Sequence, residues 1–182
     1  MSLNDCFFNL SNFPNLDQKY IDEGLYSEYP DLTKFKPPFP NGKVPKIISI
    51  PSSFKETDFF KILEKHFGDI SCVYIRNFPW STYDWHCDIL TNVNINFILH
   101  DNKNSLVLFR DRISEYSAIQ YNIRQAVYCP FKPTILNTQV QHCVINLNDD
   151  HRYILNLGFL NKSVSYQDVK EFLTNFAVFD SY

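Results

Sequence analysis

The 182-residue sequence contains only four glycines, and so few glycines argue against long flexible loops. No apolar run approaches the roughly 18 residues that a membrane-spanning helix requires. The first residues lack the basic and long apolar regions of a signal peptide. The five cysteines are odd in number and follow no disulfide framework, which is typical of free thiols in a reducing compartment. Together these absences predict a soluble, cytoplasmic protein without a membrane partner.

The sequence also lacks a strong excess of charge of either sign. It has 17 Lys and Arg residues against 20 Asp and Glu residues, and the formal net charge is -3. The basic residues form no run or stripe, whereas a protein that binds duplex DNA usually carries a basic face. The charge pattern therefore argues against nucleic acid as the main partner.

Apolar and aromatic residues, in contrast, are plentiful. Hydrophobic residues make up 45% of the chain and aromatic residues 16%. A chain of this length and composition can bury one sizeable core, so disorder is not expected. We predict a single domain over residues 1–182, with an N-terminal arm over 1–45, a core over about 46–160 and a C-terminal helix over about 165–176.

The N-terminal arm contains a proline-rich stretch. Three prolines fall within residues 37–40. Proline lacks a backbone N–H and fixes φ, so this stretch is neither a regular helix nor a central strand. We expect the arm to be extended and to pack over the core through Tyr26, Phe35 and Phe39.

Helices are predicted before and after the β-rich region of the sequence, where they would support a jelly roll from one side. The clearest covers residues 53–67, where Ser53 and Glu56 form a capping box before a row of apolar residues at helical spacing. Further helices are expected over residues 16–23 and 165–176.

The region between these helices is rich in strand signals. Eight short strands are predicted, over residues 47–50, 72–78, 94–99, 105–109, 126–128, 134–137, 139–146 and 152–159. Many short strands joined by polar turns are typical of a sandwich or barrel. With the helices confined to the flanks, we predict a mostly β protein with the cupin-like jelly roll, or double-stranded β-helix.

The first motif that carries chemistry is Trp85-His86-Cys87-Asp88. In a strand, side chains two residues apart point to the same side, so His86 and Asp88 are expected to share a face. An imidazole and a carboxylate on one face offer two adjacent ligands to a divalent metal. A single His-x-Asp triplet is nevertheless common by chance and carries little weight alone.

The second motif pairs His142 with Arg152, ten residues later. The stretch around residues 147–149 is turn-like, which suggests an antiparallel hairpin centred near residue 147. In such a hairpin His142 and Arg152 are cross-strand neighbours and enter the same cavity. His151 is a rival metal ligand, but it would point away from Arg152 and lies close to the turn.

These four residues suit one kind of metal site. Two histidines and one carboxylate form a facial triad that leaves three positions open on iron(II). The 1-carboxylate and 2-keto oxygens of 2-oxoglutarate can take two positions, and O2 the third. The far carboxylate of this cosubstrate needs a buried cation with paired planar donors, which arginine supplies. The predicted metal ligands are therefore His86, Asp88 and His142, with Arg152 as the anchor.

The order of these residues resembles that of the 2-oxoglutarate/Fe(II)-dependent dioxygenases. The sequence looks closest to the compact branch related to aspartyl/asparaginyl β-hydroxylases. The resemblance covers residues 70–160 and is carried by the segments WHCD, NVNINFIL, ILNTQVQHCVIN and RYILNLGF.

The resemblance implies a double-stranded β-helix and the coupled oxidation of 2-oxoglutarate and a substrate by O2. Succinate and CO2 are released, and a peptide side chain or a small metabolite is hydroxylated. His86, Asp88 and His142 would hold Fe(II), and Arg152 would bind the 5-carboxylate of 2-oxoglutarate.

Two further residues are candidates for the cosubstrate pocket. Asn96 lies on the strand after the first motif, and Tyr74 lies on an earlier strand, where it shares a face with Arg76. Two other functions remain open from the sequence. One is a cupin-type metalloprotein that does not use 2-oxoglutarate, and the other is a non-enzymatic jelly-roll binding module.

Overall fold

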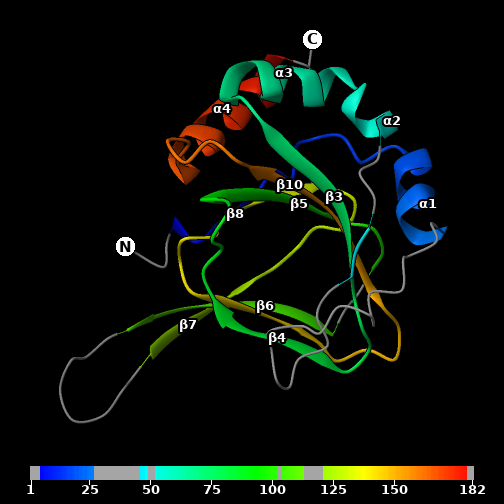
Figure 1. Cartoon of the computed structure of the whole chain (residues 1–182), viewed down its shortest axis with the longest axis vertical. Coiled ribbons are helices and arrows are strands. Elements are labelled where there is room, and N and C mark those ends of the chain that lie inside the picture. The colour runs from blue at the N-terminus through cyan, green and yellow to red at the C-terminus, as the bar shows by residue number, and fades with distance from the viewer. Residues whose placement is uncertain (1–4, 27–45, 49–51, 102–103, 113–120, 180–182) are drawn as a thin grey trace.

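The computed structural model describes residues 5–26, 46–48, 52–101, 104–112 and 121–179. Two antiparallel β-sheets face each other, and the helices cover the outer side of the larger sheet (Figure 1). Phe35, Phe39 and the three prolines within residues 37–40 lie outside the described residues. Tyr26, which was expected to pack on the core, is 79% exposed.

Among the described residues the larger sheet has six strands and the smaller sheet four. The spatial order of the larger sheet is β1 (Phe7–Asn9), β8 (Pro133–Asn137), β5 (Val93–Ile98), β10 (Arg152–Phe159), β3 (Ile70–Asn77) and β2 (Lys46–Ile48). The order of the smaller sheet is β4 (Ser81–His86), β9 (His142–Asn146), β6 (Ser105–Arg112) and β7 (Tyr121–Ala126). From β3 to β6, and again from β7 to β10, successive strands alternate between the two sheets. This alternation is that of a double-stranded β-helix, so the predicted jelly-roll fold is confirmed.

Most predicted strands occur within a few residues of their expected positions, with two exceptions. The strand predicted over residues 126–128 instead covers Tyr121–Ala126, and the one predicted over 139–146 begins only at His142. β1 and α1 (Gln18–Tyr26) lie in the region expected to be an arm, yet both join the core: β1 pairs with β8, and α1 packs near β10.

Four helices are described: α1, α2 (Ser52–Lys55), α3 (Asp58–Phe67) and α4 (Tyr166–Phe179). All of them lie on the same side of the larger sheet, while the smaller sheet forms the opposite side of the molecule (Figure 1). None of the helices in the described part of the chain has both the length and the apolar character that crossing a membrane requires.

The helix predicted over residues 53–67 is divided into α2 and α3. Thr57, between them, is the N-cap of α3, and its Oγ1 accepts a hydrogen bond from the Phe60 N–H at 3.2 Å. Ser53 lies inside α2, and its hydroxyl donates to the Glu23 carboxylate instead. The predicted Ser53–Glu56 capping box is therefore wrong, because the helix is capped four residues later by Thr57, another residue that is favoured at the N-cap.

The main hydrophobic core lies between the larger sheet and the helices. Alternate residues of β10, namely Leu155, Leu157 and Phe159, face this core. The other alternate residues, including Arg152 and Asn156, face the smaller sheet. A second, smaller core between the sheets contains Cys6, Val107, Phe109, Ala126, Leu136 and Val140. The polar residues of β5 and β10 thus line the space between the sheets.

Tyr74 belongs to the helix side of the larger sheet. Its side chain is 1% exposed, and its hydroxyl donates to the Tyr20 carbonyl of α1 at 2.9 Å. Tyr74 and Arg76 do share a face by the alternation of β3, but Tyr74 packs beneath α1. The prediction that Tyr74 lines the cosubstrate pocket is therefore wrong.

The close approach of α1 to Tyr74 depends on Gly24. A Cβ at this position would lie 2.2 Å from Leu99 Cδ1 and 2.8 Å from the Tyr74 ring. Alanine favours a helix interior by about 1 kcal/mol over glycine, but overpacking costs about 1–3 kcal/mol. We expect Gly24→Ala to lower the free energy of unfolding by up to about 2 kcal/mol in urea denaturation. A rise in stability would mean that α1 is free to move away from the sheet.

Candidate metal centre

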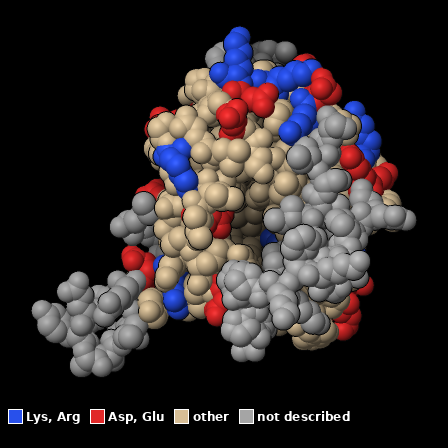
Figure 2. All heavy atoms as spheres, in the orientation of Figure 1, with Lys and Arg blue, Asp and Glu red and all other residues tan. Residues whose placement is uncertain are grey.

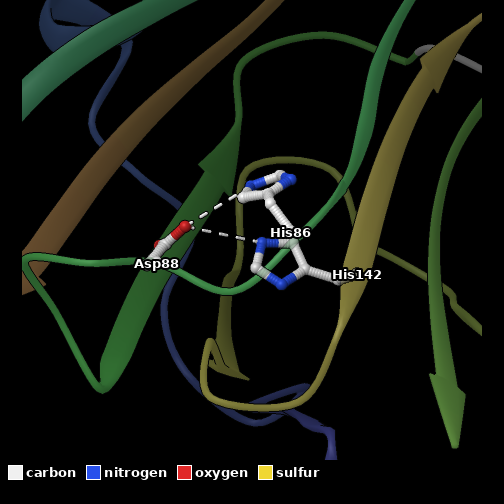
Figure 3. Close-up of side chains that lie close together, drawn as sticks. All are labelled: His86, Asp88 and His142. Atoms are coloured by element: carbon white, nitrogen blue, oxygen red, sulfur yellow. Dashed lines mark ion pairs between the residues drawn. The ribbon is translucent and has the colours of Figure 1, made fainter.

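His86 and His142 lie opposite each other at one end of the smaller sheet. His86 ends β4, His142 begins β9, and the two are Cα partners in the ladder between these strands. The register of the pair shifts between Tyr83 and His86, which marks a β-bulge or irregularity. A bulge re-aims the side chains that follow it. The two imidazole rings lie 4.3 Å apart between centroids, with both side chains between the sheets (Figure 3).

Asp88 completes the group from a loop. It was predicted to continue the strand of His86, but β4 ends at His86. The Asp88 N–H donates to the Thr138 carbonyl at 3.0 Å, and the Gln139 side chain donates to the Asp88 carbonyl at 3.1 Å. These bonds fasten the loop to the segment before β9. His86 and Asp88 do lie together as predicted. Their proximity comes from the loop that carries Asp88, and not from the alternation of side chains along a strand.

The three side chains converge as metal ligands do. Asp88 Oδ1 lies 3.4 Å from His86 Nε2 and 3.7 Å from His142 Nε2 (Figure 3). One ligand atom from each residue lies within 4.8 Å of the others. Ligands bound at about 2.1 Å from a metal are separated by about 3.0–3.4 Å. Charge-assisted hydrogen bonds are shorter, about 2.7–2.9 Å. The spacing therefore suits ligands around a cation better than a direct ion pair.

The other nitrogen of each histidine is already engaged. His142 Nδ1 lies 3.0 Å from the Val140 carbonyl, and His86 Nδ1 contacts the Asp84 carbonyl. A carbonyl can only accept, so each Nδ1 carries the proton and each Nε2 keeps its lone pair. Metal-binding histidines are usually held in this way. The donor set of two imidazoles and one carboxylate fits iron(II) or a similar divalent cation.

The electrostatics of the group are consistent with this arrangement. Burial, together with the nearby His86, holds the pKa of His142 below its usual range, so its ring stays neutral. Burial alone would raise the pKa of Asp88. The neighbouring His86 and His142 and a hydrogen bond from Asn94 outweigh burial, and the pKa of Asp88 is lowered. A neutral imidazole and an ionised carboxylate are the forms that bind metal.

Arg152 lies on the opposite sheet from His142. β9 pairs with β4 and β6 in the smaller sheet, whereas β10 pairs with β3 and β5 in the larger one. The predicted hairpin is therefore wrong, because the chain crosses from one sheet to the other between residues 146 and 152. Both side chains nevertheless face the space between the sheets. Figure 2 shows that the surface is hollowed here, with basic atoms visible inside the hollow.

The surroundings of Arg152 leave its charge only partly satisfied. The residue is 1% exposed, and Nη1 donates to Asn77 Oδ1 at 2.9 Å. Nη2 is buried and has no hydrogen-bond partner, and no carboxylate pairs with the guanidinium among the described residues. Burial lowers the pKa of Arg152, while the Tyr128 hydroxyl acts in the opposite direction. Arginine remains charged in proteins, so a positive charge is buried here without a carboxylate partner among the described residues.

A row of polar side chains connects the metal group with Arg152. Asn94 donates to Asp88 at 2.9 Å, and Asn96 follows two residues later on the same face of β5. Asn156 donates to Asn96 at 2.6 Å, and Asn96 donates to the Tyr128 hydroxyl at 3.5 Å. The Arg152 guanidinium lies 5.6 Å from the Tyr128 ring. Asn96 thus lies between the two ends of the site, and its contact with the cosubstrate stays a prediction.

Three of these residues were missed in the sequence: Asn94, Tyr128 and Asn156. A signal was present for Asn94, because Asn94 and Asn96 stand two apart in an otherwise apolar strand. Such a pair predicts a polar strip on one face. Tyr128 lies beyond the end of β7, in a loop that no local pattern orients.

A separate cavity of about 420 Å³ lies on the helix side of the larger sheet. It is lined mainly by apolar residues, among them Phe13, Phe59 and Phe97. Its two carboxylates, Asp17 and Asp58, stand at the starts of α1 and α3, where carboxylates commonly satisfy helix N-termini. The chemistry-bearing residues are therefore gathered between the sheets and not in this cavity.

No protein-family model and no curated protein matches the sequence. Among solved structures, a prolyl-4-hydroxylase of Pseudomonas putida is 13% identical, with a TM-score of 0.46 over 68% of this chain and 76% of that one. A 2OG-Fe(II) oxygenase family oxidoreductase of Burkholderia pseudomallei is 10% identical, with a TM-score of 0.44 over 62% of this chain and 57% of that one. A cupin domain of Bordetella pertussis is 15% identical, with a TM-score of 0.32 over 49% and 79%. Likenesses this distant leave the reaction to be inferred from the side chains of the site.

Proposed function

We propose that this protein is an Fe(II)- and 2-oxoglutarate-dependent oxygenase. In this proposal His86, Asp88 and His142 hold the iron, and Arg152 binds the 5-carboxylate of 2-oxoglutarate. The observation that carries the proposal is the buried, unpaired Nη2 of Arg152, which faces the same space as the three converging ligands. Neither the ligand group nor the arginine alone indicates a dicarboxylate. Together they suit a dicarboxylate that binds the metal with one end and Arg152 with the other.

The chain's own residues would bind and orient the cosubstrate. Burial raises the pKa of Tyr128, although the charge of Arg152 acts in the opposite direction, so the phenol stays protonated. A protonated Tyr128 can donate to the same carboxylate as Arg152 Nη2. The Asn96 and Asn156 side chains line the path between the two ends of the site, where apolar residues would leave a dicarboxylate without hydrogen-bond partners.

The bound iron, with 2-oxoglutarate and O2, would supply the oxidising power, and succinate and CO2 would be released. Three protein ligands leave positions on iron for both the cosubstrate and O2. The substrate class that we propose is a protein side chain or a small metabolite. The net charge of -3 supports neither a DNA nor an RNA substrate.

The decisive experiment is an anaerobic titration of 2-oxoglutarate into the iron(II)-loaded protein. Chelation of iron by the 1-carboxylate and 2-keto oxygens gives a visible metal-to-ligand charge-transfer band. We expect the band to appear only when protein, iron and 2-oxoglutarate are all present. Succinate formation in air, measured against candidate substrates, would then identify the reaction.

The other outcomes point to the alternative functions. Iron binding without the band would indicate a cupin-type metalloprotein that does not use 2-oxoglutarate. Absence of iron binding would leave a jelly-roll binding module without catalytic activity.

A further inference from the structure

The two oxygens of the Asp88 carboxylate have different surroundings. Oδ1 faces the histidines, at 3.4 Å from His86 and 3.7 Å from His142. Oδ2 accepts hydrogen bonds from Asn94 Nδ2 at 2.9 Å and from Thr91 Oγ1 at 3.3 Å. Oδ2 is thus hydrogen-bonded to Asn94 and Thr91, and Oδ1 faces the two histidines.

The orientation of Asn94 follows from the chemistry of its partner. An ionised carboxylate only accepts hydrogen bonds, so the amide must turn Nδ2 toward Asp88. Asn94 Oδ1 then points away, and it is buried without a hydrogen-bond partner among the described residues. A buried acceptor without a partner costs stability. The bond to Asp88 is therefore the feature that accounts for an asparagine at this position.

Gly158 makes room for both donors. It is the Cα partner of Asn94 across β5 and β10. A Cβ on Gly158 would lie 2.8 Å from Thr91 Cγ2 and 3.1 Å from Asn94 Oδ1. Any larger residue would push these two side chains away from their present positions, and so away from Asp88.

We infer that Asn94 and Thr91, seated against Gly158, are positioning residues that make Asp88 a one-oxygen ligand. This inference rests on the proposed metal centre. A carboxylate with two free oxygens can take two positions on a metal. Holding Oδ2 leaves only Oδ1 for the metal, which keeps positions open for other ligands.

The first test replaces Asn94 with leucine, which has a similar volume and no donor. With Co(II) as the probe, we expect the Kd of Asn94→Leu to rise by about 10–100-fold, the usual effect of removing a partner behind a metal ligand. The visible d–d bands of bound Co(II) should also change as the second carboxylate oxygen becomes available. The Tm of the metal-free variant should not fall, because the unpaired Asn94 Oδ1 is removed as well.

Matched threonine variants separate positioning from general packing. Thr91→Val removes the hydroxyl on Asp88, and we expect the Kd for Co(II) to rise by up to about tenfold. Thr134→Val removes a buried hydroxyl of the larger sheet, on β8, that donates to Asn9 Oδ1. This control should leave both the Kd and the d–d bands as in the wild type.

A rescue variant tests the role of Gly158. We expect Gly158→Ala to weaken Co(II) binding, because its Cβ displaces the Thr91 methyl. Adding Thr91→Ser removes that methyl and keeps the hydroxyl, so the double variant should regain part of the affinity. A purely structural clash elsewhere would not be relieved by this change.

The outcomes distinguish the inference from the proposed function. If the wild type binds Co(II) while Asn94→Leu and Thr91→Val keep its affinity and spectrum, the positioning role is wrong and the metal centre stands. If the wild type itself binds no Co(II), the metal centre is wrong, and this inference falls with it.

Discussion

Replacing His142 with alanine is expected to abolish iron-dependent turnover and to weaken iron(II) binding by more than about 100-fold. Removing a residue that only hydrogen-bonds to a metal ligand weakens metal binding by about 10–100-fold, and the loss of a ligand itself should exceed that. His142 is 5% exposed and contributes one of the three ligand atoms. Its ring also packs between His86 and Phe109, at centroid distances of 4.3 and 5.6 Å. Anaerobic titration with iron(II), followed by an assay for succinate, measures both effects.

Truncation to alanine also leaves a void in a packed region, so the Tm of His142→Ala should fall. His142→Gln retains more volume and lacks the imidazole, so it tests the ligand role if the alanine variant is unstable. The control is His151→Ala. His151 stands near Phe78 and Tyr153 and does not belong to the His86, Asp88 and His142 group. Full turnover by His142→Ala, with loss in His151→Ala, would show that the ligand assignment is wrong.

The residues that converge were predicted from the sequence more accurately than the backbone elements that bring them together. His86, Asp88 and His142 were predicted together from residue type and spacing, and they do converge. The irregularity near His86 and the loop that carries Asp88 were not visible, because such irregularities depend on pairing between strands distant in sequence. The turn before Arg152 was recognised, but not that it leads to the other sheet. A local turn signal does not specify the partner of the next strand.

The error at Tyr74 has a related cause. Strand alternation correctly placed Tyr74 and Arg76 on one face, but it does not say which face covers the site. In many antiparallel sheets one face is polar and exposed and the other is apolar and buried, so the sequence shows which face is inside. The larger sheet is covered on both sides, and every residue of β5 is buried. Its inner face is marked by buried polar residues such as the asparagines of β5 and β10, and among those asparagines only Asn96 was selected from the sequence.

Arg152 offers the second large effect. Replacing it with methionine removes the whole guanidinium, and we expect the Kd for 2-oxoglutarate to rise by more than about 100-fold, because two charge-assisted hydrogen bonds of about 1.5–3 kcal/mol each are lost. Arg152→Lys keeps the charge without the paired planar donors. We expect its KM for 2-oxoglutarate to rise by about 10–100-fold, which corresponds to the loss of one such bond. Iron(II) affinity should be unchanged in both variants.

The stability of the metal-free protein should move in the opposite direction from 2-oxoglutarate binding. Wild-type Arg152 is a buried cation with an unpaired Nη2, which costs folding free energy until an anion binds. Arg152→Met removes that cost but also leaves Asn77 Oδ1 without its donor. We expect the first effect to dominate, because burying an uncompensated charge costs more than leaving a neutral acceptor unpaired. The Tm of Arg152→Met should then be at least that of the wild type, and 2-oxoglutarate should raise the Tm of the wild type alone. Equal stabilisation of both proteins by 2-oxoglutarate would place the cosubstrate elsewhere.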